Sequence, residues 1–266
     1  ADESTGTMTK RFSAVNINST AENRLLFREI LFTSECMKDC IGGVILYDET
    51  INQTTSIGKS IPDLISSAGA VPGIKVDTGT KDLENSSGEK ITEGLDNLPQ
   101  RMEEYKQLGA KFAKWRAVIT IGSKMPSAAC MIANSHALAR YASICQEFDI
   151  VPIVEPEVLM DGEHDIKKCY EITNQMQNIL FESLDMLDVI FSGIVLKPNM
   201  ITAGSSCKDQ ANPDEIAELT VECLKNNVPK DVPGIAFLSG GQSDQDASNN
   251  LSNINKINTN PWKITF

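Results

Sequence analysis

The chain has 266 residues, of which 41% are hydrophobic and 23% charged, and its 24 basic and 36 acidic side chains give a formal net charge of −12. This composition supports a sizeable buried core and excludes a disordered chain. The acidic balance argues against nucleic acid or an anionic membrane surface as the main partner, because both require a basic face. An anionic substrate would have to be held by a few locally placed cations.

Cysteine and histidine usage bears on metal binding and on the cellular compartment. The seven cysteines include no CxxC motif, and Cys36 and Cys40 are the only close pair, with no second pair to complete a zinc cage. Two histidines cannot form a three-histidine metal site, although magnesium held by carboxylates stays possible. We therefore expect no metal, no cofactor and reduced thiols. With no signal peptide and no apolar run of membrane-spanning length, we expect a cytoplasmic protein without a membrane partner.

Helical and strand patterns alternate along the chain. A capping box at Ser19–Glu22 begins the first predicted helix, and Pro213 begins a later one at its first turn. Most of the predicted strands are almost continuously apolar, which is typical of a parallel sheet covered on both faces. In chain order we expect helix 19–31, strands 44–47 and 71–76, helix 95–108, strand 112–121, helix 127–148, strand 151–158, helix 166–187, strand 194–196, helix 213–224, strand 235–238, helix 243–254 and strand 262–266.

This alternation predicts an α/β fold with about seven βα units of 25–42 residues. A doubly wound sheet would alternate in the same way, but the even spacing favours a (β/α)₈ TIM barrel. We predict one domain over residues 1–266, since no linker divides the chain. The chain begins at Ala1 and stops at Phe266 inside an apolar, β-rich segment, so we expect an incomplete barrel that lacks most of strand 1.

Charged residues interrupt the apolar strands at regular positions. Alternate residues of a strand share a face, so residues two apart point to the same side. The charges are Lys75 with Asp77, Lys114 with Arg116, Glu155 with Glu157, and Lys197 at the end of its strand. A structural ion-pair network would explain them, because buried charges are usually paired. Since desolvating charges costs several kcal/mol, three consecutive charged strands favour a catalytic site.

These residue types fit a lysine nucleophile. Lys197 follows an apolar strand, and a neighbouring cation such as Lys114 would help to keep its amine neutral. A neutral amine forms a Schiff base with a carbonyl, and the protonated imine withdraws electrons from the adjacent carbon–carbon bond. Glu155, Glu157 and Asp2 are available to move protons. The residues indicate a Schiff-base lyase or aldolase.

Ser239, Gly240 and Gly241 lie between a predicted strand and an acid-capped helix. Glycines allow backbone N–H groups to approach an oxyanion, and a helix N-terminus favours negative charge. A plain tight turn would have the same sequence. The position late in the βα repeat, where barrel enzymes often bind phosphate, favours a phosphate site.

The chain as a whole resembles class I (Schiff-base) fructose-1,6-bisphosphate aldolases. The ending 262–266 and Asp77-Thr78-Gly79 are closer to bacterial members than to animal ones. Six motifs occur in the family's order and spacing: Ala1-Asp2-Glu3-Ser4-Thr5-Gly6, Pro72-Gly73-Ile74-Lys75-Val76-Asp77, Phe112-Ala113-Lys114-Trp115-Arg116, Val154-Glu155-Pro156-Glu157, Leu196-Lys197-Pro198-Asn199-Met200 and Leu238-Ser239-Gly240-Gly241-Gln242-Ser243.

The resemblance implies a role for each matching residue and a reaction without metal. Fructose 1,6-bisphosphate would be cleaved reversibly to dihydroxyacetone phosphate and glyceraldehyde 3-phosphate in glycolysis and gluconeogenesis. The implied roles are Schiff-base formation by Lys197, acid–base catalysis by Glu155 with support from Glu157 and Lys114, substrate orientation by Asp2, binding of one phosphate by Ser239 and Gly240, and contacts toward the other phosphate by Ser4, Lys75 and Arg116.

The chain also departs from the family pattern. In the family the last strand continues past Phe266 into a Ser-Tyr-Gly-Arg segment whose arginine holds phosphate, followed by a tail with a tyrosine. We therefore expect truncation at both ends and little activity from this piece, with a homotetramer for the intact family member. Another Schiff-base barrel lyase, such as a transaldolase, and a non-catalytic aldolase-like scaffold stay as alternatives.

Overall fold

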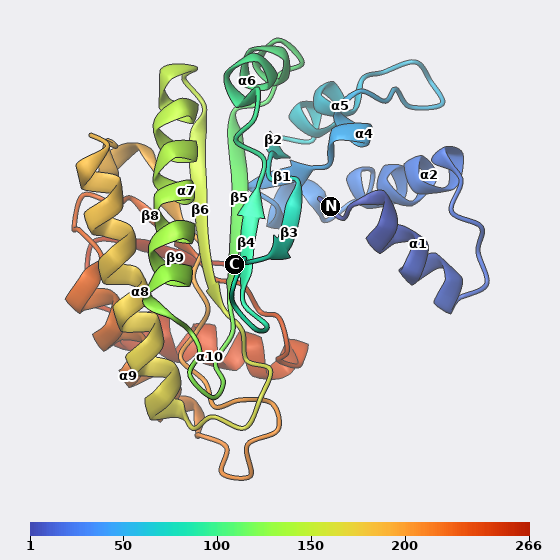
Figure 1. Cartoon of the computed structure of the whole chain (residues 1–266). Coiled ribbons are helices and arrows are strands. Elements are labelled where there is room, and N and C mark those ends of the chain that lie inside the picture. Colours follow the sequence, from blue (N-terminus) through green and yellow to red (C-terminus); the bar gives the residue numbers. More distant parts are fainter. The chain divides into compact units, whose positions relative to one another are not determined.

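The computed structural model describes all 266 residues, and Figure 1 shows their helices and strands in chain order. The chain divides into two compact units. The first unit comprises Ala1–Val76, Asn97–Lys114 and Glu147–Ile150, and the second comprises Asp77–Asp96, Trp115–Gln146 and Val151–Phe266. None of the helices combines the length and the apolar composition that a membrane span requires.

The first unit contains six helices and the start of the parallel sheet. Its helices are α1 (Thr5–Ala14), α2 (Ala21–Phe32), α3 (Met37–Cys40), α4 (Asp48–Ile51), α5 (Ile61–Ser67) and α6 (Leu98–Gln107). Its strands are β1 (Gly43–Leu46), β2 (Val71–Lys75) and the first three residues of β5 (Phe112–Ile119), in the order β1-β2-β5. Gly73 faces Phe112 in the register, and a Cβ atom at Gly73 would lie 2.4 Å from the Phe112 ring. Only glycine therefore allows β2 and β5 to approach this closely.

Side-chain caps and one buried ion pair hold the helices of the first unit. The hydroxyls of Ser4 and Thr20 accept backbone N–H groups at the starts of α1 and α2, which have no partner within the helix. Arg24 is buried on α2 and donates through Nε to Glu49 on α4 at 2.8 Å. This ion pair compensates the desolvation of the guanidinium and joins the two helices.

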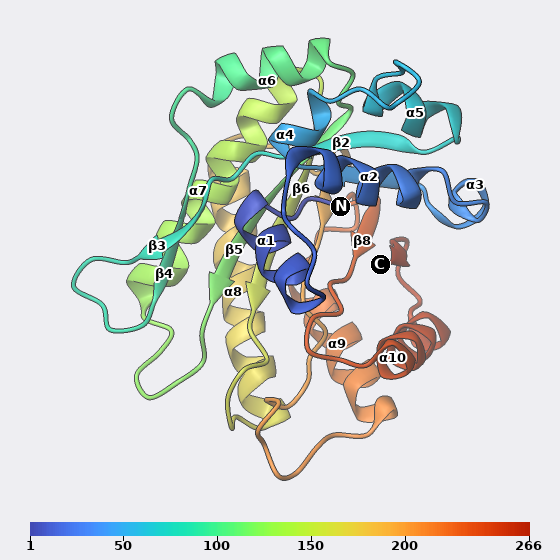
Figure 2. The ribbon, with the colours of Figure 1, turned by 90° about the vertical axis from the view of Figure 1, so that its right-hand side faces the viewer.

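The second unit contains the remaining strands in the order β5-β6-β7-β8-β9. A separate antiparallel hairpin pairs β3 with β4. The bounds are β3 (Gly79–Asp82), β4 (Lys90–Glu93), α7 (Ala128–Glu147), β6 (Val151–Val158), α8 (Ile166–Met186), the 3₁₀ turn η1 (Phe191–Gly193), β7 (Val195–Leu196), α9 (Pro213–Asn227), β8 (Gly234–Ala236), α10 (Asp244–Ile257) and β9 (Lys263–Thr265). Helices α8, α9 and α10 pack against one another in sequence (Figure 2).

All seven strands expected from the sequence are present, and so are the six long helical patterns. Helices α1, α3, α4 and α5 and the hairpin β3–β4 are not among the sequence expectations. Residues 1–4 form no strand, because Ser4 already caps α1. The single-domain assignment stays a prediction.

Candidate active site

The neighbouring strands β6 and β7 place Glu155, within β6, beside Lys197, which directly follows β7. Glu155 is 2% exposed, and its Oε1 accepts a hydrogen bond from Lys197 Nζ in an ion pair. The backbone N–H of Lys197 donates to the Val154 carbonyl at 2.8 Å, so the strand pairing itself holds the lysine next to the glutamate. The two groups predicted to form the Schiff base and to move protons are in contact.

Glu157 lies two residues beyond Glu155 on β6 and pairs with Arg116 of β5. Arg116 Nε donates to Glu157 Oε2. Burial lowers the pKa of Arg116, but the carboxylate of Glu157 outweighs this effect and raises the pKa above its ordinary value. Arg116 therefore stays fully charged, as a phosphate ligand requires.

Asp77 also belongs to this side of β5. Its carboxylate accepts the backbone N–H of Arg116 at 3.3 Å and that of Gly79 at 3.1 Å. In the sequence Asp77 is a charge at the end of a strand, and no role was expected for it. The sequence signal for Asp77 was its position two residues after Lys75, because residues two apart in a strand point to the same face.

The Ser239–Gly241 segment follows β8 and lies against the same cluster. A Cβ atom at Gly240 would lie 3.9 Å from Glu157 Oε1, which places the loop beside the Arg116–Glu157 pair. Gly241 has φ +82°, and a Cβ there would lie 2.2 Å from Met160 Sδ. Helix α10 begins three residues later, with Ser243 as its N-cap. A glycine turn before a helix N-terminus can bind a phosphate.

The first unit holds the other predicted residues. Lys114 is 6% exposed and its Nζ lies 2.6 Å from Asp2 Oδ2. Burial opposes ionisation of Asp2, but the charge of Lys114 and its hydrogen bond outweigh burial, so the pKa of Asp2 is lowered. Lys75 faces Lys114 across β2 and β5. The hydroxyl of Ser4 accepts the Thr7 N–H and so caps α1.

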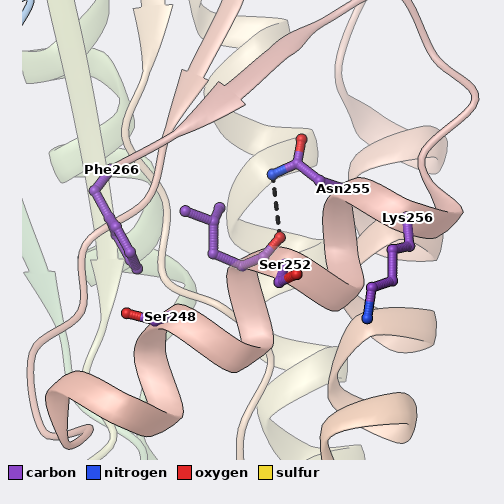
Figure 3. A pocket seen from close by; sticks show the side chains of 6 residues that line it. Ser248, Ser252, Asn255, Lys256 and Phe266 are labelled. Atoms are coloured by element: carbon purple, nitrogen blue, oxygen red, sulfur yellow. Dashed lines mark hydrogen bonds between the residues drawn. The ribbon is translucent and has the colours of Figure 1, made fainter. Parts of the chain in front are cut away.

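The predicted residues thus form two clusters, each within one unit. The first unit holds Asp2, Ser4, Lys75 and Lys114, and the second holds Arg116, Glu155, Glu157, Lys197, Ser239, Gly240 and Gly241. A shallow cavity of about 670 Å³ also lies on α10 beside Phe266 and contains none of them (Figure 3). Its lining residues are Ser248, Leu251, Ser252, Asn255, Lys256 and Phe266.

Known proteins resemble this chain over its whole length. The family model for class-I fructose-bisphosphate aldolase matches residues 1–266. The chain belongs to the class I fructose-bisphosphate aldolase family. A probable fructose-bisphosphate aldolase class 1 of Xanthomonas campestris is 50% identical over 265 residues, which are 100% of this chain and 79% of that protein. The cytosolic aldolase 5 of Arabidopsis thaliana is also 50% identical, over 100% of this chain and 74% of its own length.

A solved structure agrees with these relatives. The chain matches fructose-bisphosphate aldolase from Plasmodium falciparum, crystallised in complex with TRAP and a small-molecule inhibitor, with a TM-score of 0.98 and 42% identity. The match covers 100% of this chain and 77% of that one. The predicted α/β barrel fold of this family is therefore confirmed, and the chain is a lyase of the aldolase type.

Proposed function

We propose that Lys197 forms a Schiff base with fructose 1,6-bisphosphate, which is then cleaved to dihydroxyacetone phosphate and glyceraldehyde 3-phosphate. The observation that carries this proposal is the ion pair of Lys197, directly after β7, with the buried Glu155 of β6. Glu155 is close enough to take a proton from the ammonium group of Lys197. The neutral amine then attacks the C2 carbonyl of the ketose.

Glu155 also supplies protons in the steps that follow. As the acid, it protonates the hydroxyl of the carbinolamine, which leaves as water and gives the protonated imine. The imine withdraws the electron pair of the C3–C4 bond when a base removes the proton of the C4 hydroxyl, and glyceraldehyde 3-phosphate leaves. The resulting enamine is protonated at C3 and hydrolysed, which releases dihydroxyacetone phosphate and restores Lys197.

The remaining predicted residues would bind and orient the two ends of the substrate. Ser239, Gly240 and Gly241 would bind the phosphate of the dihydroxyacetone half at the start of α10, where backbone N–H groups and the helix dipole favour an anion. Arg116, Lys75 and Ser4 would contact the other phosphate. Asp2, which forms an ion pair with Lys114, would orient the sugar chain and assist the C3–C4 cleavage, and Glu157 and Lys114 would support Glu155.

Borohydride reduction tests the nucleophile in the full-length protein. We expect dihydroxyacetone phosphate with borohydride to leave one covalent adduct, which peptide mass mapping places on Lys197. Lys197→Met is expected to abolish it, whereas Lys168→Met, at a lysine paired with Glu171 on the surface of α8, is the matched control that keeps it. An adduct on another lysine, or none, would overturn the proposal. Turnover that persists in EDTA separates this mechanism from that of metal-dependent aldolases.

We also propose that the oligomeric state and the cellular location of the protein are those expected for the family. The full-length protein would be a cytoplasmic homotetramer, a location supported by the Arabidopsis relatives named as cytosolic. Light scattering on the purified protein should give four times the subunit mass. Subcellular fractionation should recover the protein with the soluble cytoplasm, and a monomer or a membrane fraction would contradict these assignments.

A further inference from the structure

Pro156 interrupts the hydrogen-bond ladder between β6 and β7 at the catalytic pair. The parallel register pairs Ile153 with Val195 and Val154 with Leu196, and the N–H of Lys197 continues it by donating to the Val154 carbonyl. In a regular parallel ladder the next donor would be the N–H of residue 156. Residue 156 is proline, which has no N–H. The ladder therefore stops where Glu155 and Lys197 meet.

The side chain of Asn199 bridges the interrupted ladder. In a regular ladder the N–H of Val158 would donate to the backbone carbonyl of residue 199. It donates instead to the side-chain Oδ1 of Asn199, at 3.0 Å. The Nδ2 of Asn199 donates to Thr173 Oγ1 on α8 and to the Met200 carbonyl, each at 3.1 Å. The carboxamide is 6% exposed, so these bonds form away from water.

The segment after Lys197 is thus attached to the strands on both of its sides. On one side the Asn199 carboxamide holds it to β6, one residue after Glu157. On the other side the Pro198 carbonyl accepts the Leu238 N–H at 3.1 Å, one residue before Ser239. Because residue 198 faces β8, it adds no bond to β6. Asn199 is therefore the first residue after Lys197 that is hydrogen-bonded to β6.

We infer that Asn199 is a positioning residue that sets the separation of Lys197 from Glu155. This inference rests on the proposed roles of those two residues. Proton transfer between them requires heavy atoms within about 2.6–3.2 Å, and a shift of one strand end by a fraction of that distance removes the contact. Pro156 removes one ladder bond beside the pair, and the Asn199 carboxamide supplies a bond between the same two segments.

Asn134 offers a matched control, because it makes the same kind of bond elsewhere. It is fully buried on α7, accepts the Thr92 N–H at 3.3 Å and donates to the Lys90 carbonyl at 2.9 Å. It joins the β3–β4 hairpin to a helix, and these hydrogen bonds run to neither β6 nor β7. A purely structural asparagine should affect stability in the same way at either position.

The first experiment compares Asn199→Ala with Asn134→Ala in the full-length protein. We expect Asn199→Ala to lower kcat for cleavage on the order of 100-fold, with KM changed less than about threefold, because misplaced groups lose rate rather than substrate affinity. Asn134→Ala should keep kcat within about threefold of the parent at a similar loss of unfolding free energy. The inference would be overturned if Asn199→Ala kept the kcat of the parent, or if Asn134→Ala lowered kcat as much as Asn199→Ala does.

Asn199→Asp supplies a second test if the alanine variant does not fold. A protonated carboxyl can accept from Val158 and donate to Met200 as the carboxamide does, whereas the ionised form loses the donor. We expect the ratio of its kcat to that of the parent to fall as pH rises through the pKa of the new carboxyl, which burial raises. A ratio that does not change with pH would refute the positioning role.

Borohydride trapping separates the two proposals. If the parent gives no adduct at Lys197, the proposed function fails, and the Asn199 assignment fails with it. If Lys197 is trapped and the Asn199 variants turn over normally, only the positioning role fails.

Discussion

Single residues decide how closely the loops of the second unit approach one another. Gly241 illustrates this, since its φ of +82° lies in the left-handed region and its missing Cβ leaves room for Met160. A side chain there would meet the Met160 sulfur at 2.2 Å. The turn that we propose for phosphate binding therefore depends on glycine for its backbone angle and for its packing.

Gly241→Ala is expected to raise KM for fructose 1,6-bisphosphate, because the added methyl group displaces the turn that would bind phosphate. The left-handed backbone itself costs an alanine about 1–2 kcal/mol. Steady-state kinetics check the effect. Adding Met160→Ala should reverse only the part of the KM increase that the steric clash causes. A Gly241→Ala enzyme with the parent's KM would show that this turn does not bind the substrate.

At the scale of elements, the β3–β4 hairpin supports the strand that carries Arg116. Glu89, 4% exposed, accepts the Ser86 hydroxyl at 2.6 Å and the backbone N–H and hydroxyl of Ser127 at 2.6 and 2.7 Å. These bonds join the hairpin to the start of α7. The Thr92 hydroxyl donates to the Arg116 carbonyl at 2.8 Å, so the hairpin also holds β5 beside the site.

Glu89→Gln should lower the free energy of unfolding by about 1.5–3 kcal/mol at pH 7, as expected for hydrogen bonds to a charged group. Burial raises the pKa of Glu89, but the serine donors outweigh it and lower the pKa below 4.5. A lowered pKa stabilises the fold above the unfolded-state value, and the effect disappears as pH falls through the folded-state value. Urea unfolding should therefore show the difference between parent and variant shrinking below about pH 4.

The exposed Glu84 of the same hairpin loop provides the control for this measurement. Glu84→Gln should leave the unfolding free energy within about 0.5 kcal/mol of the parent at either pH, as surface substitutions usually do. If the loss of unfolding free energy in Glu89→Gln stayed constant from neutral to acidic pH, the charge of the carboxylate would not be what strengthens its hydrogen bonds with the serines.

At the scale of the whole molecule, the protein carries a net charge of −12, although the substrate that we propose for it is also an anion. The cations of the candidate site are paired with carboxylates, as Lys197 is with Glu155 and Arg116 is with Glu157. The excess negative charge therefore repels itself across the rest of the molecule, which destabilises the folded state.

Raising the ionic strength should increase the Tm of the protein, because salt screens this repulsion. The Debye length falls from about 30 Å at 0.01 M to about 8 Å at 0.15 M, shorter than the distances between most surface charges. Differential scanning calorimetry in sodium chloride measures the effect. A Tm that falls with salt would mean that attractive ion pairs such as Arg24–Glu49 outweigh the overall repulsion.

The strands and long helices could be predicted because their signals are local. Continuous apolar runs mark the seven parallel strands, and Ser243 marks the start of α10. At α2 the N-cap is Thr20, one residue after the serine of the predicted capping box. The hairpin β3–β4 escaped prediction because its strands are short and polar, and it is held by Ser127 and Asn134 from outside its own sequence.

The sequence by itself determined the family, the βα repeat and the set of chemically active residues, because residue types and their alternation are local properties. Only the tertiary structure decided the pairing: Lys197 with Glu155, Arg116 with Glu157 and Lys114 with Asp2. The tertiary structure also brought the side chain of Asn199 to the Val158 N–H on another strand, and the positioning role that we infer rests on this hydrogen bond. Partners far apart in sequence are set by strand register, and register is a property of the packed sheet rather than of any one segment.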